Sequence, residues 1–182
     1  MAIRITIPSG DITAALRRLA AGIAARHGAA TNLILLGIAR GGVGVCQRLA
    51  VAVGEQLGRT IPQGVLNVSM HRDDLGRNPL PDLSTGTTIP VDLENAVVIL
   101  VDDVIFTGRT VRAALEELFS HGRPQRVELA VLVDRGNRCL PIAADFVGFQ
   151  EKTTPDERVS VILDAGDPAK DEIVIKSSAP IA

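Results

Sequence analysis

The chain has 182 residues, enough for one domain that buries roughly two thirds of the surface its unfolded form would expose. Hydrophobic residues make up 46% of the sequence, but Trp and Tyr are absent and only four Phe occur, so the core must consist of Val, Leu, Ile and Ala, as is typical of parallel α/β proteins. The net charge of -2 and the pI of about 5.9 give no electrostatic basis for general nucleic-acid affinity, and two scattered cysteines exclude a disulfide framework or a cysteine-based metal site.

Neither the beginning of the chain nor any later stretch has the character of a membrane or export signal. The first residues, MAIRITIPSGD, contain no apolar signal core, and no run approaches the roughly 20 apolar residues of a membrane span. We therefore expect a protein that keeps its thiols reduced in the cytoplasm and does not enter a membrane.

The first half of the chain predicts a helix, a strand and a second helix. Apolar residues recur at helical spacing over 12–26, after the capping residue Ser9, and Gly28 follows. The run LILLGI at 33–38 is continuously apolar, which indicates a strand covered on both faces. It leads directly into a glycine-rich turn at 39–42 and a helical pattern that continues to Leu57.

A strand-like stretch at 65–70 precedes a long polar segment at 71–88, which is rich in Gly and Pro. A segment of this length inside a compact domain is usually a functional lid or a protruding hairpin. We therefore expect the segment to lie near a binding site.

The second half repeats the order of strand, loop and helix. The residues at 97–101 form a second fully apolar strand, followed by a polar loop at 102–110 and a helix at 111–121. A third buried strand is predicted at 127–133. Short β-like pieces without clear helices make up the remainder, at 146–148, 159–163 and 172–175.

Apolar strands interleaved with helices predict an α/β fold with a mostly parallel central sheet flanked by helices, as one domain over residues 1–182. Sheets of this kind bind ligands at the carboxyl ends of their strands. The loops at 39–42 and 102–110 both lie at such ends, so we expect them to face one crevice.

The second of these loops combines two acids with a phosphate-binding pattern. Asp102 and Asp103 follow the apolar strand, and their carboxylates can accept hydrogen bonds from the vicinal hydroxyls of a sugar. The turn at 107–110 opens a helix, where backbone N–H groups and the helix dipole favour phosphate. This cradle consists of Thr107, Gly108, Arg109 and Thr110. The alternative is a solvated acidic turn followed by an ordinary helix cap.

The segment VILVDDVIFTGRT at 98–110 resembles the motif with which type I phosphoribosyltransferases bind 5-phosphoribosyl-1-pyrophosphate (PRPP). In that family the two acids hold the ribose 2- and 3-hydroxyls, and the turn that follows holds the 5-phosphate. The resemblance implies an enzyme that transfers ribose 5-phosphate from PRPP to a nitrogenous base.

Longer stretches at 71–76, 88–118 and 122–148 resemble the PyrR family, pyrimidine-operon regulators that are also uracil phosphoribosyltransferases. The resemblance implies a type I phosphoribosyltransferase fold with a flexible β-hairpin loop and a small hood at about 134–175. It also implies formation of UMP from uracil and PRPP, binding of pyrimidine-operon mRNA, and a homodimer or higher homo-oligomer.

The same resemblance assigns the chemistry of transfer. Arg40 and Gly41 would bind the pyrophosphate, at a turn that often contains a cis peptide bond in this family, and Arg72 would neutralise the departing pyrophosphate. Asp103 would stabilise the ribosyl cation or act as a base. Mg²⁺ would be carried by PRPP, with Asp102 as its candidate protein ligand. Plain alternatives are a glycine-rich turn at 39–42 and a solvated loop around Arg72.

Base recognition falls to backbone groups near Val133, Arg135 and Arg138 under this resemblance, and RNA contacts to Arg17, Arg18 and Arg138. Several positions that are basic or histidine in the family are not so here, which weakens the RNA prediction. These positions are Ala21, Asn137, Ala143 and Phe149. Two alternatives therefore stay open: a nucleotide-sensing RNA-binding regulator with little catalysis, and a type I phosphoribosyltransferase for another base.

Overall fold

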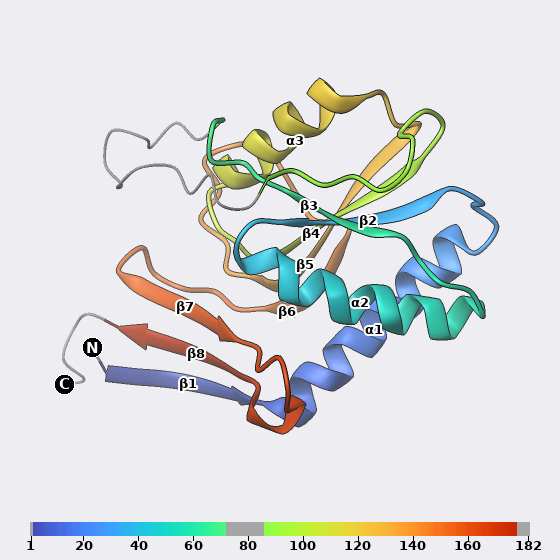
Figure 1. Ribbon diagram of the computed structural model, residues 1–182. Helices are drawn as coiled ribbons and strands as arrows, with labels where there is room; N and C mark the ends of the chain where they lie inside the picture. Colours follow the sequence, from blue (N-terminus) through green and yellow to red (C-terminus); the bar gives the residue numbers. More distant parts are fainter. Residues whose placement is uncertain (1, 72–85, 178–182) are drawn as a thin grey trace.

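The computed structural model of the protein describes residues 2–71 and 86–177, and its centre is a parallel sheet of five strands in the order β3-β2-β4-β5-β6 (Figure 1). Every neighbouring pair in this sheet is parallel. The strands are β2 (Leu33–Ile38), β3 (Gln63–Leu66), β4 (Val97–Ile105), β5 (Arg126–Asp134) and β6 (Phe146–Gln150).

Helices cover both faces of this sheet. Helices α1 (Ser9–His27) and α2 (Gly41–Leu57) lie on one face, and α3 (Arg109–His121) lies on the other (Figure 1). Side chains of β2 alternate between the two cores, so the whole strand is apolar, as expected of a strand covered on both faces. No helix in the described ranges combines the length and apolarity needed to cross a membrane.

The predicted strands at 33–38, 97–101 and 127–133 are confirmed as β2, β4 and β5, with one correction at the end of β4. This strand continues to Ile105, so Asp102 and Asp103 lie within it and not in a loop after it. The reason is the ladder to β5, which pairs Asp102 with Val131 and extends to the end of β4. Pairing with a neighbour thus outweighs the low strand propensity of aspartate.

A second, antiparallel sheet of three strands lies beside the main domain, in the order β1-β8-β7 (Figure 1). Its strands are β1 (Ala2–Pro8), β7 (Glu157–Ile162) and β8 (Glu172–Ser177), with a short 3₁₀ helix η1 (Pro168–Lys170) before β8. The sequence did not reveal β1. Strand β6, which falls inside the range 134–175 expected for the hood, belongs to the main sheet instead. We call β1, β7 and β8 the small sheet.

A buried ion pair attaches the small sheet to α2. Asp171 lies just before β8 with a fully buried carboxylate, and it pairs with the guanidinium of Arg48 on α2 through both of its oxygens. One of these oxygens also accepts the backbone N–H of Asp164 at 2.9 Å. Because a buried charge without its partner is costly, this pair fixes where the end of the small sheet lies against α2.

A second polar cluster joins α1 to β5 around Glu128, which is only 5% exposed. His27 Nε2 lies 2.7 Å from one carboxylate oxygen, and Arg126 donates to the other at 3.1 Å. Burial raises the pKa of the Glu128 carboxyl, but the bonds from His27 and Arg126 lower it more, so the net pKa lies below its ordinary value. The carboxylate is therefore charged and fully bonded.

We expect Glu128→Gln to lower the free energy of unfolding by about 1.5–3 kcal/mol at neutral pH, the usual contribution of hydrogen bonds to a charged group. The lowered pKa makes this contribution complete above the unfolded-state pKa of about 4.3 and lost as the pH falls through the folded-state value. Chemical denaturation between pH 3 and 7 measures it. Glu55→Gln, at an exposed position, is the matched control. A Glu128→Gln deficit that persists unchanged at pH 3 would contradict this assignment.

Candidate functional site

The turn after β2 lies against the end of β4. A Cβ atom built on Gly41 would lie well within 3.0 Å of the Asp103 carboxyl group, and one built on Gly42 would lie as close to the carbonyl oxygen of Val101. Real Cβ atoms do not approach other atoms so closely, so a side chain at position 42 would meet the backbone of β4 and one at position 41 would displace the Asp103 carboxylate. The turn at 39–42 and the end of β4, which we expected to face one crevice, therefore meet at this edge of the sheet.

The first side of this crevice is the turn between β2 and α2. The peptide bond between Ala39 and Arg40 is cis, in the place where the resemblance leads one to expect it. The N–H of Ala39 donates to the carbonyl of Leu66 at 2.9 Å, which fixes the turn to β3. Arg40 is exposed and precedes the first residue of α2. Its charge and the amino end of α2 both favour an anion here.

The second side of the crevice carries the two acids. Asp102 is 5% exposed, and one of its carboxylate oxygens accepts the backbone N–H of Asp103 at 3.0 Å. Asp103 is half-buried, and its Oδ1 accepts the N–H of Val104 at 2.7 Å. These bonds orient both carboxylates at the carboxyl end of the central strand, where a sugar hydroxyl or a cation can meet them.

The third side is the amino end of α3. Gly108 precedes the helix with a φ of 90°, a left-handed conformation that favours glycine. The hydroxyl of Thr107 accepts the N–H of Arg109 at 3.4 Å, and the carbonyl of Gly108 accepts the N–H of Arg112 at 3.0 Å. The turn thus directs backbone N–H groups and the positive end of the helix dipole to one place, which is suited to phosphate.

The loop after β5 supports this phosphate turn. The carbonyl of Thr107 accepts N–H groups from Cys139 at 3.0 Å and from Leu140 at 3.1 Å. The guanidinium of Arg138 donates to the carbonyl of Phe106 at 2.8 Å and pairs with Asp134 at 2.7 Å. Arg138 therefore holds the two loops together, and its side chain is engaged within the fold.

Arg135 connects the same region to the first residue of β7 and to the residues just before that strand. Its guanidinium donates to the hydroxyl of Thr153 at 2.8 Å and to the carbonyls of Thr154 and Glu157 at 2.9 and 2.7 Å. It also lies over the ring of Phe106, 4.1 Å from the ring centre. Burial lowers the pKa of Arg135, although Glu157 opposes this shift.

The remaining predicted residues lie in different surroundings. Val133 is fully buried in β5 and pairs with β4 and β6, so its backbone is committed to the sheet. Arg17 is exposed on α1, and the neighbouring Arg18 donates to the carbonyl of Gly148 at 3.1 Å. Arg72 lies outside the described residues, as does most of the predicted lid. No sequence pattern pointed to Phe106, which is the last of three apolar residues between the acids and the phosphate turn.

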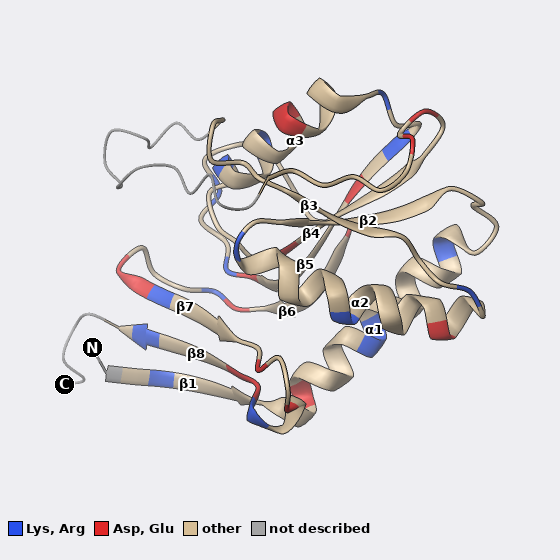
Figure 2. Ribbon diagram, in the orientation of Figure 1, with Lys and Arg blue, Asp and Glu red and all other residues tan. Residues whose placement is uncertain are grey.

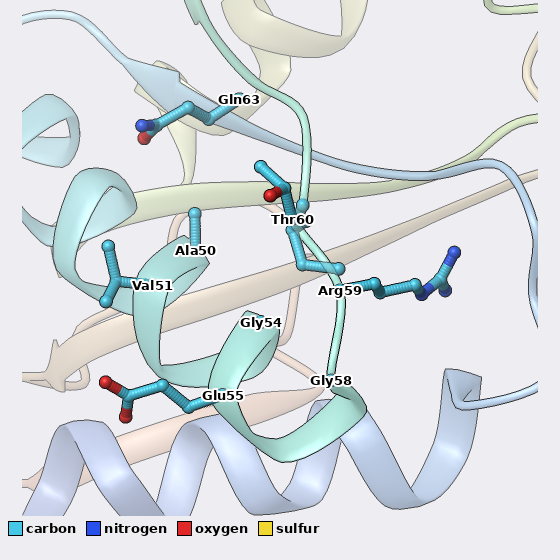
Figure 3. Close-up of a pocket in the computed structure, with 9 residues that line it drawn as sticks. Ala50, Val51, Gly54, Glu55, Gly58, Arg59, Thr60 and Gln63 are labelled. Atoms are coloured by element: carbon cyan, nitrogen blue, oxygen red, sulfur yellow. The ribbon is translucent and has the colours of Figure 1, made fainter.

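A pocket of about 480 Å³ lies elsewhere, beside the carboxyl half of α2 and the segment that leads into β3 (Figure 3). Helix α2 begins at the crevice and rises about 25 Å over its 17 residues, so this pocket lies near the opposite end of the sheet. Its lining includes Val51, Glu55, Arg59 and Gln63. Within the described ranges, no group of three or more His, Cys, Asp or Glu side chains is arranged to hold a metal ion.

Gly41 and Gly42 both lie close to β4, but we expect their substitution to have different effects. We expect Gly42→Ala to destabilise the protein by more than about 2 kcal/mol, because its methyl group would meet the backbone of β4. Gly41→Ala should unfold at nearly the wild-type temperature but displace the Asp103 carboxylate, which is a movable side chain. Thermal unfolding and a crystal structure of Gly41→Ala measure these effects.

Gly10→Ala is the control for both variants. Gly10 lies in the first turn of α1, and no atom lies within 4 Å of the position that the new methyl group would occupy. Equal unfolding temperatures for the Gly42 and Gly10 variants would contradict the prediction.

Comparisons of sequence and of structure with known proteins agree with one another. Residues 8–163 match the phosphoribosyl transferase domain family. The chain is 42% identical to the bifunctional protein PyrR of Syntrophobacter fumaroxidans, over 97% of this chain and 94% of that protein. It is 49% identical to that of Herpetosiphon aurantiacus, over 91% and 92%. The hypoxanthine phosphoribosyltransferase structure of Trypanosoma cruzi has the same fold, with a TM-score of 0.67 at 18% identity and 98% of each chain covered.

Proposed function

The chain belongs to the PyrR family of phosphoribosyltransferases, and from this premise we propose that it converts uracil and PRPP to UMP and diphosphate and also binds pyrimidine-operon mRNA in response to UMP. The proposed catalytic activity rests on one observation. The acid pair at the end of β4 lies between the Arg40 turn and the amino end of α3. Sugar, pyrophosphate and 5-phosphate thereby have adjacent binding groups.

PRPP would lie with its ribose at the acid pair and its 5-phosphate at the start of α3. The carboxylates of Asp102 and Asp103 suit the 2- and 3-hydroxyls because each is an acceptor oriented by a backbone N–H. The turn at 107–110 suits the 5-phosphate through backbone N–H groups and two threonine hydroxyls.

The pyrophosphate would lie at the turn between β2 and α2. Arg40 supplies a positive charge there, and Gly41 is the first residue of α2, whose amino end favours an anion. Positive groups at this place stabilise the charge that develops on the leaving pyrophosphate. Arg72, expected from the sequence to add a second positive charge, lies outside the described residues.

Mg²⁺ fits this site as a partner of the substrate. Hard carboxylate oxygens suit the ion, and Asp102 and Asp103 provide them, although the described residues contain no complete protein cage for a metal. Bound with PRPP, Mg²⁺ would neutralise the pyrophosphate and so make it a better leaving group. Asp102 is the residue that we assign to hold it.

The transfer needs no covalent nucleophile from the protein. A ribosyl centre that loses pyrophosphate develops positive charge, and the carboxylate of Asp103 is placed to stabilise it or to accept a proton from the incoming base nitrogen. The base would approach from the loop after β5. Because the Arg135 and Arg138 side chains and the Val133 backbone are engaged, we assign base recognition to the backbone around Gly136 to Arg138.

We expect the double substitution Asp102→Asn with Asp103→Asn to reduce UMP formation at least about 100-fold, as is usual when groups that stabilise developing charge are removed. The fold should persist, because asparagine keeps the shape and an acceptor oxygen. Steady-state assays with uracil and PRPP, together with circular dichroism, measure both effects. Asp11→Asn, at an exposed position of α1, is the control. Unchanged turnover in the double variant would remove the acid pair from the mechanism.

A panel of bases tests the specificity part of the proposal. Uracil should be used in preference to hypoxanthine, guanine and orotate, each assayed by kcat/KM at fixed PRPP concentration. A preference for a purine would support a phosphoribosyltransferase but contradict uracil as its substrate. UMP binding without turnover of any base would favour a nucleotide-sensing regulator.

RNA binding would use basic residues of α1, which Figure 2 shows in blue along that helix. Arg17 is exposed and suited to a phosphate, whereas Arg138 is held inside its loop and contributes less. The likeness to bifunctional PyrR proteins supports the regulatory function. We propose that a homodimer or a higher homo-oligomer binds the RNA, as expected from the sequence. A two-fold assembly would bring a second α1 to one RNA.

Arg17→Ala should weaken binding of pyrimidine-operon leader RNA in the presence of UMP. The slope of log K against log salt concentration should become shallower by about 0.7–0.9, the contribution of one phosphate contact. Gel-shift titrations at several salt concentrations measure this slope. Arg158→Ala, an exposed arginine of the small sheet, is the matched control. Equal slopes for the wild type and the Arg17 variant would remove Arg17 from the RNA-binding surface.

A further inference from the structure

Glu117, in the middle of α3, binds the chain on both sides of the segment 72–85. Its side chain is only 14% exposed. One oxygen accepts the hydroxyl of Thr87 at 2.5 Å and lies 3.0 Å from Nε2 of His121, and the other lies 2.9 Å from Nε2 of His71. A single carboxylate therefore joins the last residue before that segment to a residue just after it.

His71 lies between two carboxylates of α3. Its Nε2 faces Glu117, and its Nδ1 lies 3.4 Å from Glu116. Both ring nitrogens donate only when the imidazole is protonated, whereas the neutral ring presents a lone pair to one of the two acids. The contact between His71 and α3 is therefore stronger in the charged form.

The main chain on both sides of the segment is fixed as well. Arg112 of α3 donates to the carbonyl of His71 at 2.6 Å. The hydroxyl of Thr87, besides donating to Glu117, accepts the N–H of Asn67 at 3.0 Å. Thr88 exchanges two backbone hydrogen bonds with Val65 of β3, at 2.8 and 2.9 Å. We call His71, Thr87 and Glu117 the anchor.

The anchor does not have the arrangement of a metal site. His71 and His121 contact different oxygens of Glu117. Among the described residues, no three His, Cys, Asp or Glu side chains are placed to hold a metal ion together. Burial raises the pKa of the Glu117 carboxyl, but the hydrogen bonds from Thr87, His121 and His71 together lower it below its ordinary value. Glu117 is therefore a charged acceptor at neutral pH.

We propose that Glu117 is a positioning residue for phosphoribosyl transfer: it fixes the chain on both sides of the segment that carries Arg72 to the helix that begins with the phosphate turn. The proposal rests on the proposed function. Glu117 lies eight residues beyond Arg109, or about 12 Å along α3, so it does not touch the substrate itself. It acts by holding His71 and Thr87, which flank the segment that contains Arg72.

Steady-state kinetics test the role. In Glu117→Gln and His71→Gln we expect the KM for PRPP to rise about tenfold, the scale of one lost hydrogen bond to a charged group, with a smaller change in kcat. Glu117→Asp should restore part of the affinity. His121→Gln is the matched control, because it removes a histidine from the same carboxylate without touching either end of the segment.

Amide hydrogen exchange without substrate separates this proposal from the proposed function. The N–H groups of His71 and Thr88, which bond to Val68 and Val65, should lose protection about tenfold in Glu117→Gln and remain unchanged in His121→Gln. If the wild type does not convert uracil to UMP, the proposed function is wrong. The role of the anchor is then tested separately, by amide hydrogen exchange and by calorimetric measurement of PRPP affinity. Unchanged exchange in Glu117→Gln, or exchange that changes while PRPP affinity does not, overturns the positioning role.

Discussion

The close approach of the turn after β2 to the end of β4 is the constraint on which the site depends. Gly41 leaves the space that the Asp103 carboxylate occupies, and Gly42 leaves the space of the Val101 carbonyl. A side chain at position 42 would push the pyrophosphate turn away from the backbone of β4, and one at position 41 would displace the Asp103 carboxylate. Parallel pairing of β2 with β4 brings the two strand ends to the same edge, and the absence of two side chains brings them into contact.

The arginines near this edge show how one residue type serves two purposes. Arg40 is exposed at the crevice, where a positive charge can meet an anion. Arg135 and Arg138 instead satisfy carbonyl groups of the loops around the phosphate turn, and Arg135 also stacks on Phe106. A guanidinium has five donors in a planar fork, so it can join several carbonyls at once and hold irregular loops without secondary structure.

Helix α3 links the parts of the site that come from distant places in the chain. Its amino end forms the phosphate turn, its buried face packs on the sheet, and Glu117 holds the chain on both sides of the segment 72–85. The loop after β5 in turn bonds the residue that precedes this helix by two positions, Thr107. A shift of α3 would therefore affect phosphate binding and the anchor together, because both are built on one rigid element.

Local patterns in the sequence determined the three central strands, the glycine turn, the acid pair and the phosphate turn, because each depends on residues that are neighbours in the chain. Only the tertiary structure decided that β1 pairs with β8 from the other end of the chain, that β4 extends through its two acids, and that Arg135 and Arg138 bind loops. The anchor belongs to the same class, since Thr87 and His71 meet Glu117 only through the fold. Periodicity and motifs report which face of an element is apolar and which turn a glycine permits, whereas the partner of a polar side chain is set by long-range packing that no local pattern encodes.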